Sequence, residues 1–298
     1  MEDKYLPDHK YKVGDEFYSI SLSGGRSSAF MLHRFLEANN GLPSNAVICF
    51  ANTGKEHNST LDFVHEISVN WGVPITWLEY EYKPDARGGR KDPKHCHKIV
   101  NHNSAARSGE PYWSMIMGRQ KYLPNKVQRI CTMELKVSTM RRYIQRDLGQ
   151  QQHIAYIGIR YDEPKRWAKA LLSEDCRNRF PMVTEKITKR DVLQFWKRQP
   201  FDLKTPDLYG NCDLCFLKGT RKLVEAIKKD PSRADWWVNA EKEVFKRNKR
   251  YLAKPQNARF HFDESYEQLK ERALSEQTLW DGVMPLPVDE EIDCFCGD

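Results

Sequence analysis

Cysteines are the residues whose spacing most directly indicates chemistry in this sequence. The 298-residue chain contains eight of them, and four form two close pairs, Cys212-x-x-Cys215 and Cys294-x-Cys296. Such pairs are typical of metal ligands or of redox dithiols. The N-terminal residues, Met-Glu-Asp-Lys, do not have the basic and then apolar layout of a signal peptide. We therefore expect a cytoplasmic protein whose cysteines are reduced rather than paired in a disulfide framework.

A second chemical feature is the glycine-rich turn SGGRSS, at residues 23–28. Adjacent glycines allow the backbone to approach a ligand closely, and the start of a helix presents unpaired N–H groups to an anion. The turn follows a predicted strand over 16–21 and opens a predicted helix over 28–38. This placement predicts a phosphate cradle rather than an ordinary strand-to-helix turn. Its spacing matches neither the Walker motif nor the dinucleotide-binding GxGxxG motif.

Strands and helices alternate after this turn, which favours βαβ units and a parallel sheet. We predict an α/β fold with an open, mainly parallel sheet and helices on both faces. The further predicted strands cover 46–50, 74–80 and 153–159. The further predicted helices cover 60–69, with Ser59 as the N-cap, 137–148, and 189–196, capped by Thr188. The basic stretch at 83–98, rich in turn-forming residues, is predicted to be a mobile surface loop.

The composition changes after Gln199-Pro200. We therefore predict two units, a nucleotide-binding domain over 1–200 and a smaller helical module over 201–298 that carries cysteines. Helices are expected around Trp236-Trp237 and over 266–274. We interpret the two tryptophans as packing residues of this module.

Three segments together carry a resemblance to a known family. SLSGGRSSAF resembles the PP-loop, of the SGGxDS type, found in the adenine nucleotide α-hydrolase-like superfamily. FANTGKEH, at 50–57, resembles the FANTG-x-E segment of its phosphoadenosine phosphosulfate reductase branch, and GIRYDE, at 158–163, resembles the GIR-x-DE motif. The resemblance covers about residues 16–220. One departure is that Ser27 stands where the family has an Asp.

The resemblance implies an adenine nucleotide, ATP or a relative, with Mg²⁺ as an optional companion. It assigns the nucleotide to the carboxyl ends of the strands, where ligands of open α/β sheets bind. Arg160 is expected to meet a phosphate or sulfate, for which a guanidinium fork is suited. The expected nucleotide-binding residues are Ser23, Gly24, Gly25, Arg26, Ser27, Ser28, Asn52, Thr53, Gly54, Arg160 and Arg166. Asp162 and Glu163 have two possible roles, as acidic residues at the start of a helix or as catalytic carboxylates. Arg160 and Glu163 are the candidates for catalysis in this segment.

The resemblance also implies a metal site. RICTMELKV, at 129–137, resembles the CC-x-x-RKV segment that supplies two iron–sulfur ligands in adenylylsulfate reductases, with Cys131 kept and Thr132 in the second place. Cys212 and Cys215 follow where that family has its second ligand pair. An all-cysteine site suits a [4Fe–4S] cluster or zinc, and the family favours the cluster. The fourth ligand is expected to be one of the tail cysteines, Cys294 in the first place or Cys296, or the position stays open to sulfide or substrate.

The tail offers a weaker similarity to the catalytic ECG motif of sulfonucleotide reductases. Cys296-Gly297 matches two of its residues, whereas Phe295 replaces the Glu. Cys296 is thus a candidate nucleophile, ranked below a ligand role for this cysteine pair. Cys49, within an apolar strand, is predicted to be a core residue, and Cys176 a structural one. His95-Cys96-His97 is predicted to lie in a solvated loop rather than in a metal site.

Charge and composition limit the partners. The net charge is +7, with 40% hydrophobic and 11% aromatic residues, which excludes wholesale disorder and permits an anionic partner. No apolar run is long enough to span a bilayer, so no membrane is expected as a partner. Scattered basic clusters and eight tryptophans make tRNA or DNA an eligible acceptor, although each cluster alone is typical of a solvated surface. The sequence leaves the oligomeric state undetermined.

These features together predict an enzyme of adenine-nucleotide-dependent sulfur chemistry. In the first version, a sulfurtransferase adenylates an acceptor, releases pyrophosphate and transfers sulfur supplied by a donor protein. In the second, a reductase converts a sulfonucleotide to sulfite with Cys296 and an electron donor protein. A third hypothesis is a non-catalytic nucleotide- or nucleic-acid-binding sensor, which the Ser27 departure favours.

Overall fold

A six-stranded sheet forms the centre of the protein. The computed structural model describes residues 11–89, 91–119, 121–171, 177–206, 208–248 and 258–277. The sheet order is β4-β3-β2-β1-β5-β6. All neighbouring strands are parallel except β3 and β4, which pair antiparallel. The strands are β1 Tyr18–Leu22, β2 Ala46–Asn52, β3 Thr76–Tyr82, β4 His95–Val100, β5 Ile154–Ile157 and β6 Asn178–Arg179.

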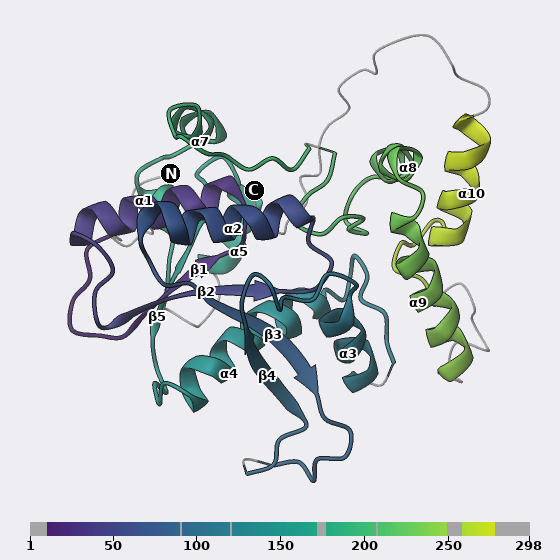
Figure 1. Cartoon of the computed structure of the whole chain (residues 1–298), viewed down its shortest axis with the longest axis horizontal. Helices are drawn as coiled ribbons and strands as arrows, with labels where there is room; N and C mark the ends of the chain where they lie inside the picture. Colours follow the sequence, from purple (N-terminus) through teal and green to yellow (C-terminus); the bar gives the residue numbers. More distant parts are fainter. Residues whose placement is uncertain are drawn as a thin grey trace.

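Helices flank the sheet, which confirms the predicted α/β class. In Figure 1, α1, α2 and α7 lie on one side of the strands, α4 lies on the other, and α8, α9 and α10 group beyond one end of the sheet. No helix of the described ranges is long and apolar enough to cross a membrane. The helices are α1 Arg26–Asn39, α2 Asn58–Trp71, α3 Glu110–Gly118, a π-helix at Thr132–Ser138, α4 Thr139–Arg146, α5 Pro164–Leu171, α6 Pro181–Thr184, α7 Lys189–Trp196, α8 Thr220–Lys229, α9 Arg233–Arg247 and α10 Tyr266–Gln277.

The central strands and helices follow the apolar pattern of the sequence, because each of them buries apolar side chains in the core. Strand β1 alternates little and is buried along almost its whole length, as expected for a central strand covered by helices on both faces. Helix α1 buries Ala29, Leu32 and Phe35 against the sheet. Thr188 and Asp191 form a reciprocal capping box at α7, as the sequence predicts for Thr188.

Three local predictions are wrong. Helix α2 is capped by His57, whose ring nitrogen accepts from the Ser59 backbone N–H at 3.2 Å, and not by Ser59. The stretch at 83–98 is not all loop, because His95–Val100 pairs with β3 as an edge strand. The His95-Cys96-His97 motif accordingly lies in a strand, with Cys96 buried. The predicted helix at 137–148, in contrast, is present as α4, and the helical segment extends toward the N-terminus through the π-helix.

A second hydrophobic core lies around α8, α9 and α10. Residues from both sides of the predicted boundary at residue 200 contribute to it. It includes Trp237 and Phe260 from the C-terminal part and Tyr112 and Leu135 from the sheet-bearing part. Trp237 is fully buried and Trp236 packs against this core, so the prediction that they are packing residues is confirmed.

Candidate functional site

The glycine turn follows β1 and begins α1, as predicted. Gly24 has φ +83°, and a Cβ added there would lie 2.6 Å from Thr60 Cγ2 and 3.2 Å from a ring carbon of Phe50. Only glycine therefore fits, both for its backbone angle and for its contact with α2. Gly25 precedes the first turn of α1 without a side-chain cap. The backbone N–H groups at the start of this helix are thus not used by a capping side chain.

Serine hydroxyls hold the shape of this turn. Ser28 Oγ donates to Gly25 O at 3.0 Å and accepts the Ser23 backbone N–H at 3.0 Å. The hydroxyls of Ser23 and Ser28 lie 2.8 Å apart. The turn is therefore held in one conformation by its own side chains, which is the preorganisation that an anion-binding backbone requires.

Arg26 points away from the turn. Its guanidinium forms two bonds with Asp202, at 2.7 and 3.0 Å, and a third with Leu203 O at 2.7 Å. In this conformation the residue offers its backbone N–H to the turn, and its side chain fixes the segment that leads to the C-terminal part.

Arg160 is brought to the turn from the segment after β5. Its side chain is 2% exposed, and its guanidinium donates to Ser27 Oγ at 2.9 Å and to Asp162 Oδ1 at 3.0 Å. Gly158 makes this approach possible, since a Cβ there would lie 2.7 Å from Ser28 Cα. A guanidinium thus lies against the hydroxyl of Ser27, at the position where the resembled family has a carboxylate.

Glu163 is held by arginines and by backbone. One carboxylate oxygen accepts the Arg160 backbone N–H at 2.9 Å, and the other pairs with Arg166. Asp162 accepts the Lys189 backbone N–H at 2.9 Å. Glu163 immediately precedes α5, and Arg166 lies in its first turn. These contacts connect the GIR-x-DE segment to α5 and α7.

The loop after β2 lies at the carboxyl edge of the sheet, next to the glycine turn. Asn52 is fully buried, and its side chain bonds Glu79 Oε1 at 2.6 Å, Ala106 O at 2.9 Å and the Gly54 backbone N–H at 3.0 Å. Gly54 has φ +76° and lies against Gly109. All three bonds of the Asn52 side chain are made within the protein, so this side chain fixes the shape of the loop. The backbone of the loop, rather than this side chain, is left to contact a ligand.

Glu56 is a functional candidate that the sequence analysis did not single out. Its side chain is fully buried, and its Oε2 accepts from the hydroxyl and backbone N–H of Thr53 at 2.7 and 2.8 Å. Its Oε1 has no hydrogen-bond partner among the described residues and lies 3.8 Å from Lys136 Nζ. Burial raises the pKa of Glu56 despite the opposing effects of Lys136 and Thr53. Its position in FANTGKEH is the signal that could have identified it.

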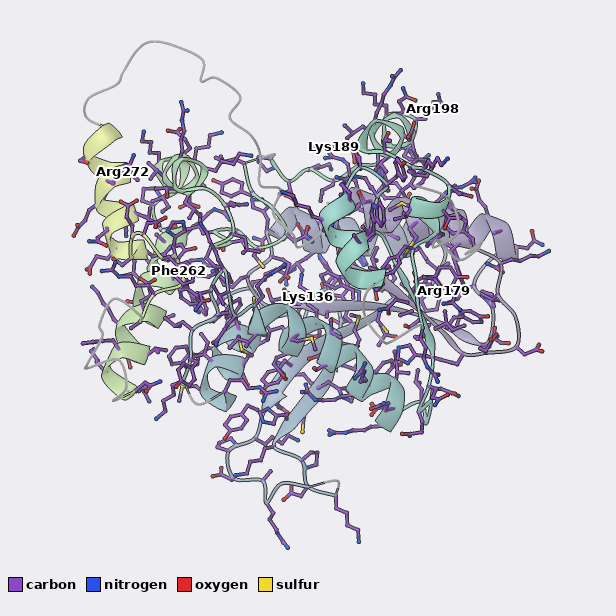
Figure 2. All side chains as sticks on the ribbon, turned by 180° about the vertical axis from the view of Figure 1, so that it is seen from behind. Lys136, Arg179, Lys189, Arg198, Phe262 and Arg272 are labelled. Carbon is purple, nitrogen blue, oxygen red and sulfur yellow. The ribbon has the colours of Figure 1, made fainter. Side chains whose placement is uncertain are left out.

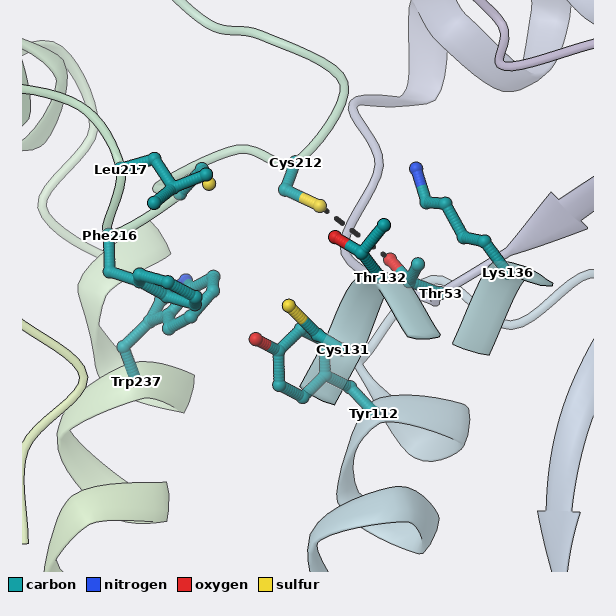
Figure 3. A pocket seen from close by; sticks show the side chains of 10 residues that line it. Thr53, Tyr112, Cys131, Thr132, Lys136, Cys212, Phe216, Leu217 and Trp237 are labelled. Carbon is teal, nitrogen blue, oxygen red and sulfur yellow. Dashed lines mark hydrogen bonds between the residues drawn. The ribbon is translucent and has the colours of Figure 1, made fainter. Parts of the chain in front are cut away.

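Cys131, Cys212 and Cys215 line one pocket. Figure 3 shows Cys131 and Cys212 facing it from opposite sides, with Lys136 at its edge. Cys212 and Cys215 are buried, and Cys131 is half-buried. Burial and the neighbouring Cys131, Cys212 and Cys215 hold the pKa of Tyr112 well above its usual range. The complete lining is Thr53, Tyr112, Cys131, Thr132, Lys136, Cys212, Cys215, Phe216, Leu217 and Trp237.

The π-helix explains how one segment supplies three of these residues. It begins directly after Cys131 and covers Thr132–Ser138. Its wider turn places residues four and five apart on one face, so that Thr132 and Lys136 both line the pocket with Cys131. Glu134, on the same segment, pairs with Arg119 and with Arg142 at 2.8 Å. This pairing lowers the pKa of Glu134 against the opposing effect of its burial.

The Cys212–Cys215 loop is fastened to the carboxyl edge of the sheet. Cys212 forms an antiparallel bridge with Glu56, and its Sγ lies 3.9 Å from Thr53 Oγ1. The Asp213 backbone N–H donates to Lys55 O at 2.8 Å. Asn211 Nδ2 donates to Ser23 O, in the glycine turn, at 3.1 Å. The cysteine pocket and the predicted phosphate cradle are therefore neighbouring parts of one site.

A buried ion pair reinforces this attachment. Lys55 Nζ lies 3.1 Å from Asp213 Oδ2, with the two side chains 7% and 9% exposed. Trp237 Nε1 donates to Asp213 Oδ1 at 3.1 Å, and the Lys55 ammonium lies 5.1 Å from the centre of the Trp236 ring. The ion pair joins the loop after β2, the cysteine loop and α9.

The donor chemistry of the pocket fits a metal–thiolate centre. Three thiols line it, two of them buried. Within the described ranges, no three His, Cys, Asp or Glu side chains are arranged to hold a single metal ion. The expected ligand Cys294 and the candidate nucleophile Cys296 lie outside the described residues, as does Cys176. Cys49 is a core residue, as predicted, and burial raises the pKa of its thiol to about 12.

Comparisons with known proteins show similarity to two uncharacterized proteins of Escherichia phages. No protein-family model matches it. It is 25% identical over 180 residues to the uncharacterized 37.8 kDa protein in the gpa 5′ region of Escherichia phage 186, covering 53% of this chain and 52% of that protein. It is 31% identical over 210 residues to the uncharacterized nin region protein ORF290 of Escherichia phage lambda, covering 70% of this chain and 69% of that protein. The chain belongs to the family of this phage lambda protein.

Proposed function

We propose that the protein catalyses adenine-nucleotide-dependent sulfur transfer to an acceptor, in keeping with its resemblance to the phosphoadenosine phosphosulfate reductase branch of the PP-loop superfamily. The observation that carries the proposal is the bond from Asn211, the residue before Cys212, to Ser23 in the glycine turn. It joins a thiol-lined pocket to a turn that is built for a phosphate. Sulfur chemistry and nucleotide chemistry require this proximity, because the activated acceptor must meet the sulfur before water reaches it.

The first step is adenylation. An oxygen on the acceptor attacks the α-phosphorus of ATP, a P–O bond forms, and the bond to pyrophosphate breaks. The N–H groups at the start of α1 are suited to the negative charge of the phosphates. Arg160, at the Ser27 hydroxyl, supplies a fixed cation beside the same turn.

The second step replaces the activated oxygen. A sulfur nucleophile at the oxidation level of sulfide attacks the carbon, a C–S bond forms, and the C–O bond breaks to release AMP. Two protons go to solvent, and no electrons are exchanged, so that a sulfur donor protein is the one further reactant. Tyr112, Phe216 and Trp237 surround the thiols with ring carbons and keep the pocket poor in water.

Cys131, Cys212 and Cys215 would hold a [4Fe–4S] centre, for which Cys294 is the proposed fourth ligand. When bound, such a centre supplies iron that can hold sulfide. The ligands of a cluster bind separate iron atoms and therefore stand farther apart than those of one ion, which suits thiols spread around a shared pocket. Zinc is the alternative for an all-thiolate site.

Metal analysis and product analysis test the proposal. Protein purified without oxygen should contain iron and acid-labile sulfide. Cys212→Ser should remove both, whereas Cys96→Ser, at a buried cysteine outside the pocket, should leave them in place. Stoichiometric zinc in colourless protein would refute the cluster.

Incubation with ATP, a sulfide source and RNA or DNA should release pyrophosphate and AMP in equal amounts. Sulfite formed from a sulfonucleotide, without pyrophosphate from ATP, would identify a reductase instead. Nucleotide binding without any product would identify a sensor. Either outcome would reject sulfur transfer.

A further inference from the structure

An ordered aromatic pair lies on the surface directly beside Arg160. The rings of Tyr161 and Trp167 stack with their centres 6.4 Å apart and their planes at 15°. Trp167 Nε1 donates to Tyr161 O at 3.0 Å, which fixes the indole ring and satisfies its polar atom. Tyr161 is nevertheless 40% exposed. A preordered aromatic face open to solvent is what a nucleic acid base stacks on.

Three exposed cations lie on the two helices next to this pair. Lys165 lies on α5, and Lys189 and Arg190 lie on α7. The two helices start side by side, because the Tyr161 backbone N–H donates to Ile187 O at 2.9 Å. Figure 2 shows Lys189 and Arg198 at the outer surface around α7. We call Tyr161, Trp167, Lys165, Lys189 and Arg190 the basic aromatic surface.

The two lysines of this surface are not neutralised by neighbouring carboxylates. Lys165 and Lys189 form no ion pair with another described residue, whereas Arg190 interacts electrostatically with the adjacent Asp191. The nearby carboxylates already have partners. Asp162 is held by Arg160 and a backbone N–H, Glu163 by Arg160 and Arg166, and Asp191 by the Thr188 capping box.

Fold stability does not explain these cations. Each lies in the first turn of its helix, where the positive end of the helix dipole makes a positive side chain unfavourable. A phosphate backbone would supply the missing negative charge.

The position of the surface relates it to the nucleotide site. Arg160 extends inward to Ser27, whereas the next residue, Tyr161, is exposed. A base stacked on Tyr161 would therefore lie next to Arg160, the residue that contacts the glycine turn. The cations are distributed over two helices beside an exposed ring, and this arrangement suits phosphates that are spaced along a strand.

We propose that the basic aromatic surface binds a single-stranded segment of nucleic acid, with one base on Tyr161 and its backbone phosphates near Lys165, Lys189 and Arg190. Only the identification of this strand as the acceptor rests on the proposed function. The binding itself is independent of any turnover.

The test uses the full-length protein and fluorescent 12-nucleotide RNA and DNA strands, with binding measured by anisotropy. Tyr161→Ala should weaken binding about tenfold, whereas Tyr161→Phe should retain it, because stacking on one base needs the ring and not the hydroxyl. Lys165→Ala combined with Lys189→Ala should lower the slope of log Kd against log salt by about 1.4, or roughly 0.7 for each lost phosphate contact.

The control variants carry the same types of substitution in the C-terminal part of the chain, away from the basic aromatic surface. Phe262→Ala removes another exposed aromatic ring and Lys229→Ala another exposed lysine, and neither should alter Kd or the salt slope. The corresponding blunt duplex should bind less tightly than the strands, because its bases are already stacked.

Three results would overturn the proposal: no strand binding, equal binding of the duplex, or an unchanged salt slope in the double variant. A fourth is loss of ATP affinity in Tyr161→Ala matching the loss of strand affinity, which would mean that the ring serves the base of the mononucleotide. Strand binding without any pyrophosphate release would reject the proposed function alone. Pyrophosphate release with an acceptor other than nucleic acid, and no strand binding, would reject this surface alone.

Discussion

The ion pair between Lys55 and Asp213 offers a quantitative test of how the cysteine loop is held. Both side chains are more than nine-tenths buried, so solvent screens their interaction little. Asp213→Ala removes the carboxylate, leaves the Lys55 charge buried without its partner, and deprives Trp237 Nε1 of its acceptor. Removing one partner of such a pair costs about 3–5 kcal/mol, and we expect a loss of this size in the free energy of unfolding.

The matched control is a double variant, Lys55→Met with Asp213→Leu. It removes both charges and leaves two donors without the Asp213 acceptor, the Trp237 indole N–H and the Leu214 backbone N–H, each at a cost of about 1–3 kcal/mol. The double variant should therefore be more stable than Asp213→Ala, although it carries one more substitution. Urea unfolding followed by tryptophan fluorescence measures all of these free energies.

Hydrogen exchange shows whether the loss is local. A loss of about 3 kcal/mol in the loop should speed exchange of amides over 211–217 by about 100-fold, since 1.4 kcal/mol corresponds to a factor of ten. Amides of α1 should change much less. If the double variant is as unstable as the sum of its single variants, or if exchange over 211–217 does not increase, the ion pair does not fasten this loop.

Two further predictions concern the glycine turn and the C-terminal core. Gly24→Ala should abolish measurable ATP binding in calorimetry and lower Tm, because its Cβ would clash with Thr60, whereas Gly219→Ala, with open space around it, should change neither. Burial raises the pKa of Glu241 from 4.5 to about 7, so the folded chain holds this proton more tightly than the unfolded chain. The resulting stability, roughly 3 kcal/mol, is full below pH 4.5 and is lost as the pH rises to 7 and above; Glu241→Gln should flatten this dependence in urea midpoints measured from pH 4.5 to 8.

Apolar periodicity was sufficient for the strands and helices of the central sheet, because these elements bury one face or both. It failed at β4, an edge strand with the sequence HCHKIV, in which only Cys96 is buried. An edge strand that leaves most side chains in water shows no apolar alternation, and its pairing with β3 depends on backbone hydrogen bonds that sequence patterns do not reveal.

The site was predictable only where a motif existed. The position of Gly24 after a strand and before a helix identified the turn, and the resemblance brought Cys131 together with Cys212 and Cys215. The Lys55–Asp213 pair joins residues more than 150 positions apart, and the burial of Glu56 depends on the neighbours that cover its side chain. The spacing of residues in one sequence reveals neither the contact nor the burial. The π-helix was likewise not predictable, since its periodicity over Thr132–Ser138 lies too close to that of an α-helix.

The shared lining of the cysteine pocket sets an order of events during synthesis. Cys131 leaves the ribosome long before Cys212 and Cys215, and the wall formed by Trp237 is made later still. The described strands of the sheet all precede residue 180, so the sheet of the N-terminal part has been synthesised before the opposite wall of the pocket exists. Any group that needs all three thiols is therefore acquired only near the end of translation or afterwards, by a chain that is already largely folded.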